Sequence, residues 1–291
     1  PKNLPENIEC VMFADDLKNF SSIENTDDKQ KLQNAANRVQ NWANKWQLKL
    51  SVDKCCMLHI GRQNKNYEYY LNGNLITKND EAKDLGILMT SNGKFSKHIQ
   101  NVVKRAHLII SQMFKIFAYK DPKLLLKAYK TYVRPILEYN SPVWSPYYMK
   151  DIGLIEKVQK RFTRILMQNP SIEYPNRLQL LNIQSLEERR IETDLIEAFK
   201  YIKQIANNRS NNFFEISKNR YKQNYVQITY CRTVMRKYWF SNRTGKLWNK
   251  LPENLRSANN IKKFKILLRE TDLRHFCKGP DLYGRNALGY P

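Results

Sequence analysis

Two adjacent aspartates near the start of the chain are the residues with the clearest chemical use. Asp15 and Asp16 follow an apolar run from Ile8 to Ala14, and an alternating stretch resumes after them from Leu17 to Phe20. A strand, a tight turn and a second strand would place both carboxylates at the tip of a hairpin. Because Mg²⁺ takes one or two carboxylates together with substrate phosphate oxygens, this pair could hold a divalent metal where phosphates arrive. An ordinary polar turn is the alternative interpretation.

A row of cations further along the chain is the second candidate. Four basic residues recur three or four positions apart and would share one face of a helix: Lys157, Lys160, Arg161 and Arg164. The opposite face would carry an apolar stripe: Ile155, Val158, Phe162 and Ile165. Such a cationic strip binds phosphate backbones without reading their sequence, and its affinity falls steeply with salt. A solvated helix face is the alternative.

The charge of the chain is unevenly distributed. The 291 residues include 50 Lys and Arg against 27 Asp and Glu, which gives a net charge of +23. Residues 1–60 hold eight of each sign, so the whole excess lies after them. A neutral segment followed by a strongly basic one is what a carboxylate site attached to a polyanion-binding surface would show. A basic surface that only confers solubility is the competing interpretation.

The composition excludes several classes of protein. With 42% apolar and 12% aromatic residues, the chain can build folded cores and is not a disordered basic tail. Its length predicts about two domains, at roughly 150 residues each. No apolar run reaches the roughly 18 residues of a membrane span, and the five cysteines are scattered and odd in number. We therefore expect an intracellular protein with no membrane partner, in a reducing compartment.

The elements that would position the aspartates form an α+β part. After the first hairpin, Asn25 or Thr26 is expected to cap a helix that ends near Lys45, with Trp46 on its buried face. The other predicted elements are a strand from Leu48 to Ile60, a hairpin from Tyr67 to Ile76 around Asn72-Gly73-Asn74, and a last strand from Asp84 to Met89. A domain boundary is expected near residues 90–95.

Beyond residue 95 the apolar period becomes helical. The predicted helices are one capped by Ser96 and reaching Phe117, one from Asp121-Pro122 to Pro135, one over Ile152 to Ile165, and one that has a Ser185/Glu188 capping box and runs to about Ala206. Residues 139–148 are predicted to form a loop. Its aromatics Tyr139 and Trp144 could stack on bases, although such residues more often anchor packing.

Ordered blocks along nearly the whole chain match one pattern. The first block is Phe13-Ala14-Asp15-Asp16. The others follow in order: Leu50 to Cys55, Lys83 to Ile87, Lys97 to Ile99, Tyr132 to Tyr139, Val143 to Pro146, Ile155 to Arg161, Ser185 to Arg190 and Trp248 to Pro252. Together they resemble the reverse transcriptases of non-LTR, LINE-type retrotransposons, especially the jockey-like group. The first block is similar to the aromatic-Ala-Asp-Asp catalytic box of that family.

The resemblance implies a place for each part of the chain. Residues 1–90 would be the closing part of a polymerase palm, residues 91–170 a helical thumb, and residues 171–291 a basic, mostly helical C-terminal region. Asp15 and Asp16 would be catalytic, metal-binding carboxylates. Lys54 would lie near the leaving pyrophosphate, and Leu85-Gly86 would belong to the hairpin that grips the primer end. A surface lysine and a plain turn glycine are the alternative interpretations.

The resulting hypothesis is part of an RNA-directed DNA polymerase. With Mg²⁺, for which Mn²⁺ could substitute, the intact enzyme would transfer nucleotides from dNTP to a primer 3′-OH on an RNA template, and it would hold a DNA primer or an RNA–DNA hybrid. The family's other metal aspartate precedes the box on a strand outside this sequence. We therefore expect a fragment that is inactive alone. The rival hypothesis is a non-catalytic, nucleic-acid-binding remnant of such an element.

Overall fold

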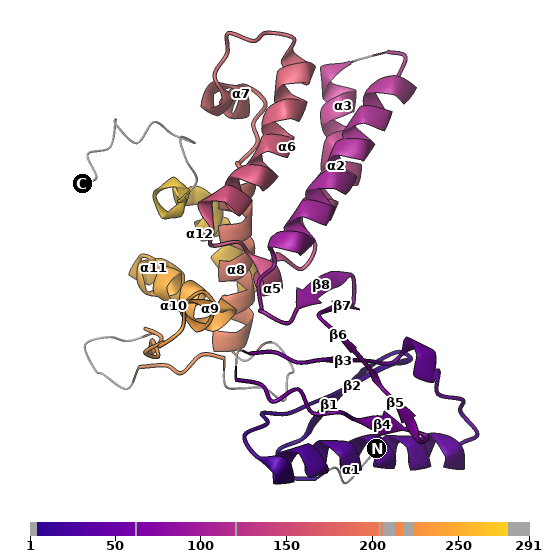
Figure 1. Cartoon of the computed structure of the whole chain (residues 1–291). Coiled ribbons are helices and arrows are strands. Elements are labelled where there is room, and N and C mark those ends of the chain that lie inside the picture. Colours follow the sequence, from indigo (N-terminus) through magenta and orange to yellow (C-terminus); the bar gives the residue numbers. More distant parts are fainter. Residues whose placement is uncertain are drawn as a thin grey trace. The chain divides into compact units, whose positions relative to one another are not determined.

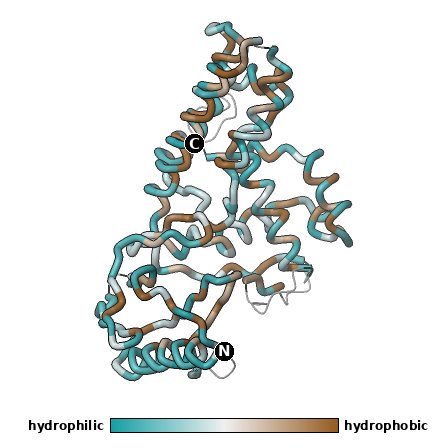
Figure 2. Tube along the Cα trace, turned by 90° about the vertical axis from the view of Figure 1, so that its right-hand side faces the viewer, coloured by the Kyte–Doolittle hydropathy of each residue, from teal (hydrophilic) through white to brown (hydrophobic). Residues whose placement is uncertain are grey.

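The computed structural model describes residues 5–61, 63–119, 121–203, 205, 213–217 and 224–278, and it confirms the predicted α+β class (Figure 1). The chain divides into two units, Pro1–Lys94 and Phe95–Pro291, and each is described by itself. In Figure 2 the helices change between brown and teal along their coils, which is the banding of amphipathic helices with one buried face. Within the described ranges, no helix combines the length and apolarity needed to cross a bilayer.

The first unit opens with the hairpin that carries the two aspartates. β1 (Glu9–Phe13) pairs antiparallel with β2 (Asp16–Phe20). Ala14 and Asp15 are the two residues of the turn between them. The predicted strand, turn and strand are confirmed, with the difference that Asp16 is the first residue of the second strand.

The helix after this hairpin has the predicted bounds. α1 (Thr26–Lys45) starts with a capping box, in which the Asn25 side chain accepts from the Asp28 backbone N–H and the Asp28 carboxylate accepts from the Asn25 backbone N–H. Its buried residues are Leu32, Ala35, Val39 and Ala43. Trp46 lies beyond the last turn and is 63% exposed, so its predicted place on the buried face is wrong.

The other described strands of this unit form three further two-stranded sheets. β3 (Cys56–Leu58) pairs in parallel with β6 (Thr77–Asn79), β4 (Tyr70–Leu71) pairs with β5 (Asn74–Leu75), and β7 (Glu81–Asp84) pairs with β8 (Ile87–Thr90). The β4–β5 hairpin turns at Asn72 and Gly73, as predicted. Both residues have positive φ (52° and 74°), which is the requirement of a type I′ turn and the reason for the Asn-Gly pair.

Two strand predictions in this unit are wrong. Residues 48–60 are not one strand, because the polar Ser-Val-Asp-Lys stretch folds into a 3₁₀ turn, η1 (Val52–Lys54), and Cys56–Leu58 is the part that pairs. Residues 84–89 are not one strand either. Leu85 and Gly86 form a two-residue turn with positive φ at both (43° and 87°), which glycine favours, so the chain folds back into the β7–β8 hairpin.

The second unit is mainly helical. Its described elements are α2 (Ser96–Ile116), α3 (Pro122–Ala128), η2 (Tyr129–Val133), α4 (Arg134–Glu138), α5 (Ser141–Trp144), α6 (Met149–Met167), α7 (Tyr174–Leu180), α8 (Leu186–Ile202), α9 (Val234–Lys237), α10 (Phe240–Asn249), α11 (Glu253–Arg256), α12 (Ile261–Glu270) and η3 (Arg274–Phe276). α6 packs along both α2 and α3, and α8 contacts α5, α6, α10 and α12 (Figure 1). The helix α8 is therefore the central element of the unit.

Large aromatic side chains fill the core of this unit. Six of them are fully buried: Tyr129, Trp144, Phe162, Phe199, Trp248 and Phe264. Burial of each contributes about 2–3 kcal/mol. The Trp144 indole N–H donates to the Tyr139 carbonyl oxygen (2.8 Å), and its ring meets His98 edge-on. Trp144 is thus a packing anchor, whereas the Tyr139 side chain is exposed.

The start of α2 differs from the prediction because a tertiary contact competes for its serine. Phe95 is the N-cap residue, with no side-chain cap bond, and Ser96 is the first helical residue. The Ser96 hydroxyl donates to Oδ2 of Asp151 in α6 (2.5 Å). The side chain predicted to cap the helix instead ties α2 to α6.

Three further predictions in this unit need correction. The helix expected to stop at Pro135 continues through it, because the π-helical turn η2 lies directly before and Pro135 occupies the second position of α4, where its missing N–H costs nothing. The loop predicted over residues 139–148 contains the short helix α5. The α8 capping box is confirmed, but the helix ends at Ile202, and Ala206 lies outside the described residues.

Candidate functional site

The two aspartates lie at the exposed tip of the β1–β2 hairpin. Phe13 stands opposite Asp16, so Ala14 and Asp15 alone make the turn. Ala14 has φ of 52° and Asp15 does not have positive φ, which is the pattern of a type II′ turn, where glycine is the favoured first residue. A left-handed alanine costs about 1–2 kcal/mol. Such strain is typical of functional sites and fixes the carboxylates at a sharp reversal of the chain.

Large apolar side chains surround these carboxylates and are open to solvent. Val11, Met12 and Phe13 are 47%, 62% and 63% exposed. Among the described residues, β1 has β2 as its sole strand partner, so no strand pairs with its other edge. Val11 and Phe13 share one face of β1 and Met12 lies on the other, so both faces of the strand expose apolar side chains.

A second hairpin is held beside the first by an ion pair. Lys18 of β2 pairs with Asp84, the last residue of β7, and the turn at Leu85 and Gly86 follows directly. Lys18 is two positions after Asp16, so both side chains share one face of β2. The structure thereby brings the predicted primer-grip turn to the strand that carries Asp16.

The sequence interpretation missed Lys18 and Asp84. The strand period was a usable signal for Lys18, because a residue two positions from a candidate ligand shares its face. Asp84 had no such signal, since its partner is 66 residues away along the chain.

Lys54 is not bonded to the aspartates. It ends η1, its side chain is exposed, and its backbone N–H donates to the Ser51 carbonyl oxygen (3.1 Å). In the ranges that the structure describes, no hydrogen bond or ion pair joins its ammonium to Asp15 or Asp16. The same ranges contain no group of three or more His, Cys, Asp or Glu that could hold a metal. Asp15 and Asp16 are therefore two candidate ligands, and no third His, Cys, Asp or Glu of the described residues groups with them.

The predicted cationic strip lies on α6, with its four residues in different surroundings. Lys157 and Arg164 are exposed. Lys160 is half-buried, with Nζ 5.2 Å from the centre of the Tyr174 ring. Arg161 is exposed but reaches α2, where its guanidinium lies 3.2 Å from Nδ1 of His107. Lys157 and Arg164 are thus free for phosphate contact, while the two residues between them also hold neighbouring helices.

Burial and the adjacent Arg161 both lower the pKa of His107. The imidazole is therefore neutral near pH 7 and can accept from the guanidinium. The contact joins α2 and α6 below the strip.

The apolar stripe of α6 agrees with the prediction except at its end. Ile155, Val158 and Phe162 are fully buried, whereas Ile165 is 37% exposed. Ile165 lies in the last turn of α6, where fewer neighbouring helices cover it. It lines a surface hollow together with Arg161 and with Ser111 of α2.

Residues of two blocks of the family-like pattern form a buried polar network with Tyr129 and Tyr174 instead of a reactive site. The Tyr129 hydroxyl donates to Gln159 (2.9 Å), whose amide donates to the Tyr174 hydroxyl (3.0 Å), and that hydroxyl donates to Glu156. Burial raises the pKa of Glu156, which also accepts from the backbone N–H of Leu186 (3.2 Å). The network ties η2, α6, α7 and α8 together, so these residues serve the fold.

A second link connects two blocks of the pattern. Arg189 of α8 binds Glu138 of α4 through both Nε and Nη2, the latter at 2.9 Å. The paired geometry of a guanidinium and a carboxylate fixes the angle between the two helices. These blocks therefore resemble the family through residues that hold the helical unit together.

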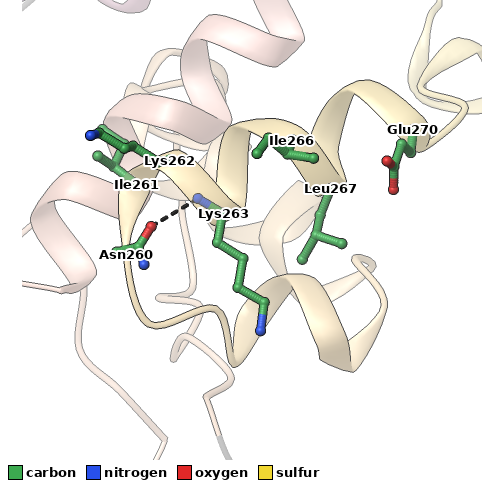
Figure 3. A pocket seen from close by; sticks show the side chains of 7 residues that line it. All are labelled: Asn260, Ile261, Lys262, Lys263, Ile266, Leu267 and Glu270. Atoms are coloured by element: carbon green, nitrogen blue, oxygen red, sulfur yellow. Dashed lines mark hydrogen bonds between the residues drawn. The ribbon is translucent and has the colours of Figure 1, made fainter.

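A shallow hollow on α12 holds none of the predicted site residues. It is lined by Asn260, Ile261, Lys262, Lys263, Ile266, Leu267 and Glu270 (Figure 3). The dashed line in Figure 3 marks Asn260 Oδ1 accepting from the Lys263 backbone N–H (2.8 Å), which is the N-cap bond of the helix. Its lining combines three aliphatic residues with two lysines, one asparagine and a single carboxylate, which is no set of groups suited to catalysis.

Comparisons with known proteins support the relationship to reverse transcriptases. A stretch of 143 residues, 48% of this chain, is 24% identical to the RNA-directed DNA polymerase from mobile element jockey of Drosophila melanogaster and covers 16% of that protein. A stretch of 115 residues, 38% of this chain, is 30% identical to an uncharacterised protein of Caenorhabditis elegans and covers 58% of it. No family model and no solved structure matches. The chain spans only part of these relatives, and it is similar, at a distance, to a reverse transcriptase of a mobile element.

Proposed function

We propose that this chain supplies the two-aspartate part of an RNA-directed DNA polymerase from a LINE-type, jockey-like retrotransposon. The reaction would join a nucleotide from dNTP to a primer 3′-OH on an RNA template. The observation that carries the proposal is the Phe13-Ala14-Asp15-Asp16 box at an exposed, strained hairpin tip in a chain similar to the jockey polymerase.

The donor set at the tip suits Mg²⁺, with Mn²⁺ as a substitute. Asp15 and Asp16 offer hard carboxylate oxygens, and Mg²⁺ binds one or two carboxylates while water and substrate phosphates complete its shell. Bound metal would supply the charge that stabilises the transferring phosphoryl oxygens. Two carboxylates, with no third of the described residues grouped with them, are half of a two-metal site, so the remaining carboxylate would come from another segment of a longer protein.

Other residues of the chain would position the nucleic acid. The β7–β8 turn at Leu85 and Gly86 presents backbone without a bulky side chain at Gly86, so a primer end could approach closely. Lys54 would add positive charge near the pyrophosphate. On α6, Lys157 and Arg164 would contact duplex phosphates without reading sequence.

A non-catalytic, nucleic-acid-binding remnant is the second candidate. The observation that favours it is that the described residues offer a cationic α6 face but no third carboxylate near Asp15 and Asp16. Such a protein would keep the binding surface and need no metal.

Primer extension separates the two candidates. We would join this chain to the part of the jockey polymerase that precedes its own Asp-Asp box and supply an RNA template, a DNA primer, dNTP and Mg²⁺. Extension by the chimaera, with none by residues 1–291 alone, is the expected result. A chimaera that binds the template and primer but adds no nucleotide supports the remnant, and extension by residues 1–291 alone contradicts the shared site.

A further inference from the structure

A cluster of three tyrosines brings together two distant segments of the second unit. Tyr147 and Tyr148 precede α6, and Tyr238 lies between α9 and α10. The rings of Tyr147 and Tyr238 stack at 4.5 Å with an interplanar angle of 1°, and those of Tyr147 and Tyr148 lie 4.2 Å apart. All three are half-buried, so part of each ring faces solvent. We call these residues the tyrosine cluster.

Lysines lie over both ends of the tyrosine cluster. Nζ of Lys150 is 5.6 Å from the Tyr148 ring centre, while those of Lys278 and Lys237 are 4.9 Å and 5.7 Å from the Tyr238 ring centre. These distances are within the range of cation–π contacts. The ammonium groups therefore cover the outer faces of the stacked rings, where the cluster holds three positive charges within reach of phosphate groups.

The positive charge around this cluster is concentrated enough to affect a lysine. Burial lowers the pKa of Lys278, and the nearby Lys246, Lys237 and Arg243 act in the same direction. Glu187 opposes them and accepts from the Lys278 backbone N–H (2.7 Å). Since the cations outnumber this one acid, a bound anion would relieve their mutual repulsion.

The segment beside the cluster adds an exposed ring and further cations. Trp239 directly follows Tyr238 and is 52% exposed, so its ring is open to a base. Arg232 and Arg236 are exposed as well. The sequence contains nine Lys and Arg between Glu215 and Glu253, and no acidic residue. This stretch of sequence therefore carries no negative charge that would repel the phosphates of a nucleic acid.

We propose that Trp239 binds single-stranded nucleic acid by stacking on an unpaired base, while Lys150, Lys237 and Lys278, held on the tyrosine cluster, contact the phosphates. Stacking needs base faces that are open, and a duplex hides them between neighbouring base pairs. The site is thus distinct in kind from the α6 face, whose cations have no exposed aromatic rings among them. It goes beyond the proposed polymerase site and does not depend on that proposal.

Binding by the full chain tests this inference. The probes are fluorescein-labelled 20-mers of oligo(U) and oligo(dT), a 20-base-pair RNA–DNA hybrid, and poly-glutamate as an acidic peptide. Trp239→Ala is expected to weaken binding to both single strands by about tenfold, since one stacked base contributes roughly 1–3 kcal/mol. Binding to the hybrid should change less than about threefold.

Three substitutions serve as matched controls. Trp239→Phe keeps an aromatic face and should retain most of the affinity, whereas Trp239→Leu, which keeps apolar volume without an aromatic face, should not. Trp46→Ala removes another exposed tryptophan, in the first unit, and should change nothing. Circular dichroism and thermal unfolding check that each variant folds.

A second variant keeps the test valid if Trp239→Ala does not fold. Lys150→Gln with Lys237→Gln removes two exposed ammonium groups and should weaken single-strand binding, whereas Lys262→Gln with Lys263→Gln on α12 should not. The inference is overturned by unchanged single-strand affinity in the cluster variants, by equal losses on the hybrid, or by tighter binding of poly-glutamate. Primer extension is not a readout here, so failure of this site and failure of the proposed polymerase site are separate results.

Discussion

The two units of this protein differ in how completely each buries its large apolar side chains. The second unit buries six large aromatic side chains completely, and buried polar networks link its helices. The first unit carries the candidate metal ligands on a two-stranded ribbon whose apolar residues Val11, Met12 and Phe13 remain exposed. The comparison teaches that the unit with the candidate site leaves large apolar side chains exposed, while the helical unit buries its own.

The ion pairs of the two units show the same contrast. Lys18 and Asp84 in the first unit are partly exposed, so their pair contributes at most about 1 kcal/mol. Arg243 and Asp194 in the second unit are nearly buried, with Nε to Oδ2 at 2.9 Å, and the same guanidinium donates to the Pro142 carbonyl oxygen (2.6 Å). Removal of one partner should therefore matter far more in the second unit.

The largest effect is expected at the hairpin tip. Asp15→Asn in the active chimaera keeps the shape of the side chain but removes a ligand charge, so extension should fall about a thousandfold or more, equivalent to roughly 4 kcal/mol. Asp53→Asn is the matched control, because Asp53 is an exposed acid of the same unit. Steady-state primer extension measures both. Activity of Asp15→Asn within about tenfold of the parent would mean that the carboxylate is only part of a turn.

The next effect is on stability and sharpens the contrast between the ion pairs. Arg243→Met leaves the Asp194 carboxylate buried without its partner and should cost about 3–5 kcal/mol in the free energy of unfolding near pH 7. Lys18→Met should cost less than about 1 kcal/mol. Urea unfolding of each variant gives the two values. Equal losses would contradict this contrast between the two ion pairs.

The loss of unfolding free energy caused by Arg243→Met should depend on pH. Burial raises the pKa of Asp194, and Arg243 partly offsets this shift, so the variant raises that pKa further. A carboxyl whose folded pKa exceeds its unfolded value favours the folded state when protonated, and its ionisation destabilises the fold as pH rises. The difference in unfolding free energy between parent and variant should therefore shrink from pH 7 to about pH 5. A constant difference would mean that Asp194 stays ionised.

A smaller effect is expected on the α6 face. Lys157→Gln with Arg164→Gln should reduce the slope of log affinity against log salt by about two units on a template–primer duplex, because each lost phosphate contact removes about 0.9. Two unrelated duplexes should be affected equally. Lys262→Gln with Lys263→Gln serves as the control of equal charge. An unchanged slope would assign duplex binding to another basic surface.

The smallest effect is expected at the strained turn residue. Ala14→Gly relieves the left-handed backbone strain, although glycine adds freedom to the unfolded chain, so the net gain in stability should be about 1 kcal/mol or less. Hydrogen exchange of the β1–β2 amides would detect it. A loss of stability would show that Ala14 contributes packing that glycine lacks.

Local signals were sufficient for a large part of the fold. The cap predicted at Asn25 or Thr26, the Asn72-Gly73 turn and the Ser185/Glu188 capping box each depend on residues within a few positions, and the structure has all three, with Asn25 as the cap. Predictions failed where a distant partner decides the outcome. Ser96 bonds to Asp151, 55 residues away, and the stretch after α1 becomes a strand only where β6 pairs with it.

The site was predictable to the same degree. The position of Asp15 and Asp16 on a hairpin tip followed from the alternation of apolar and polar residues, because a two-residue turn fixes its own geometry. The contact of Lys18 with Asp84 and the stacking of Tyr147 on Tyr238 join residues 66 and 91 positions apart. No periodic pattern encodes such contacts, so they could be found only in the folded chain.

The edge of β1 that pairs with no described strand has a practical consequence for anyone who purifies this protein. A strand with such an edge and with exposed Val11, Met12 and Phe13 is a template for edge-to-edge pairing between molecules. The charges of Asp15 and Asp16 at its end act as gatekeepers against such aggregation. Neutralising one of them to test chemistry also lowers colloidal stability, so light scattering should accompany every assay of Asp15→Asn, and dilute stocks should be used.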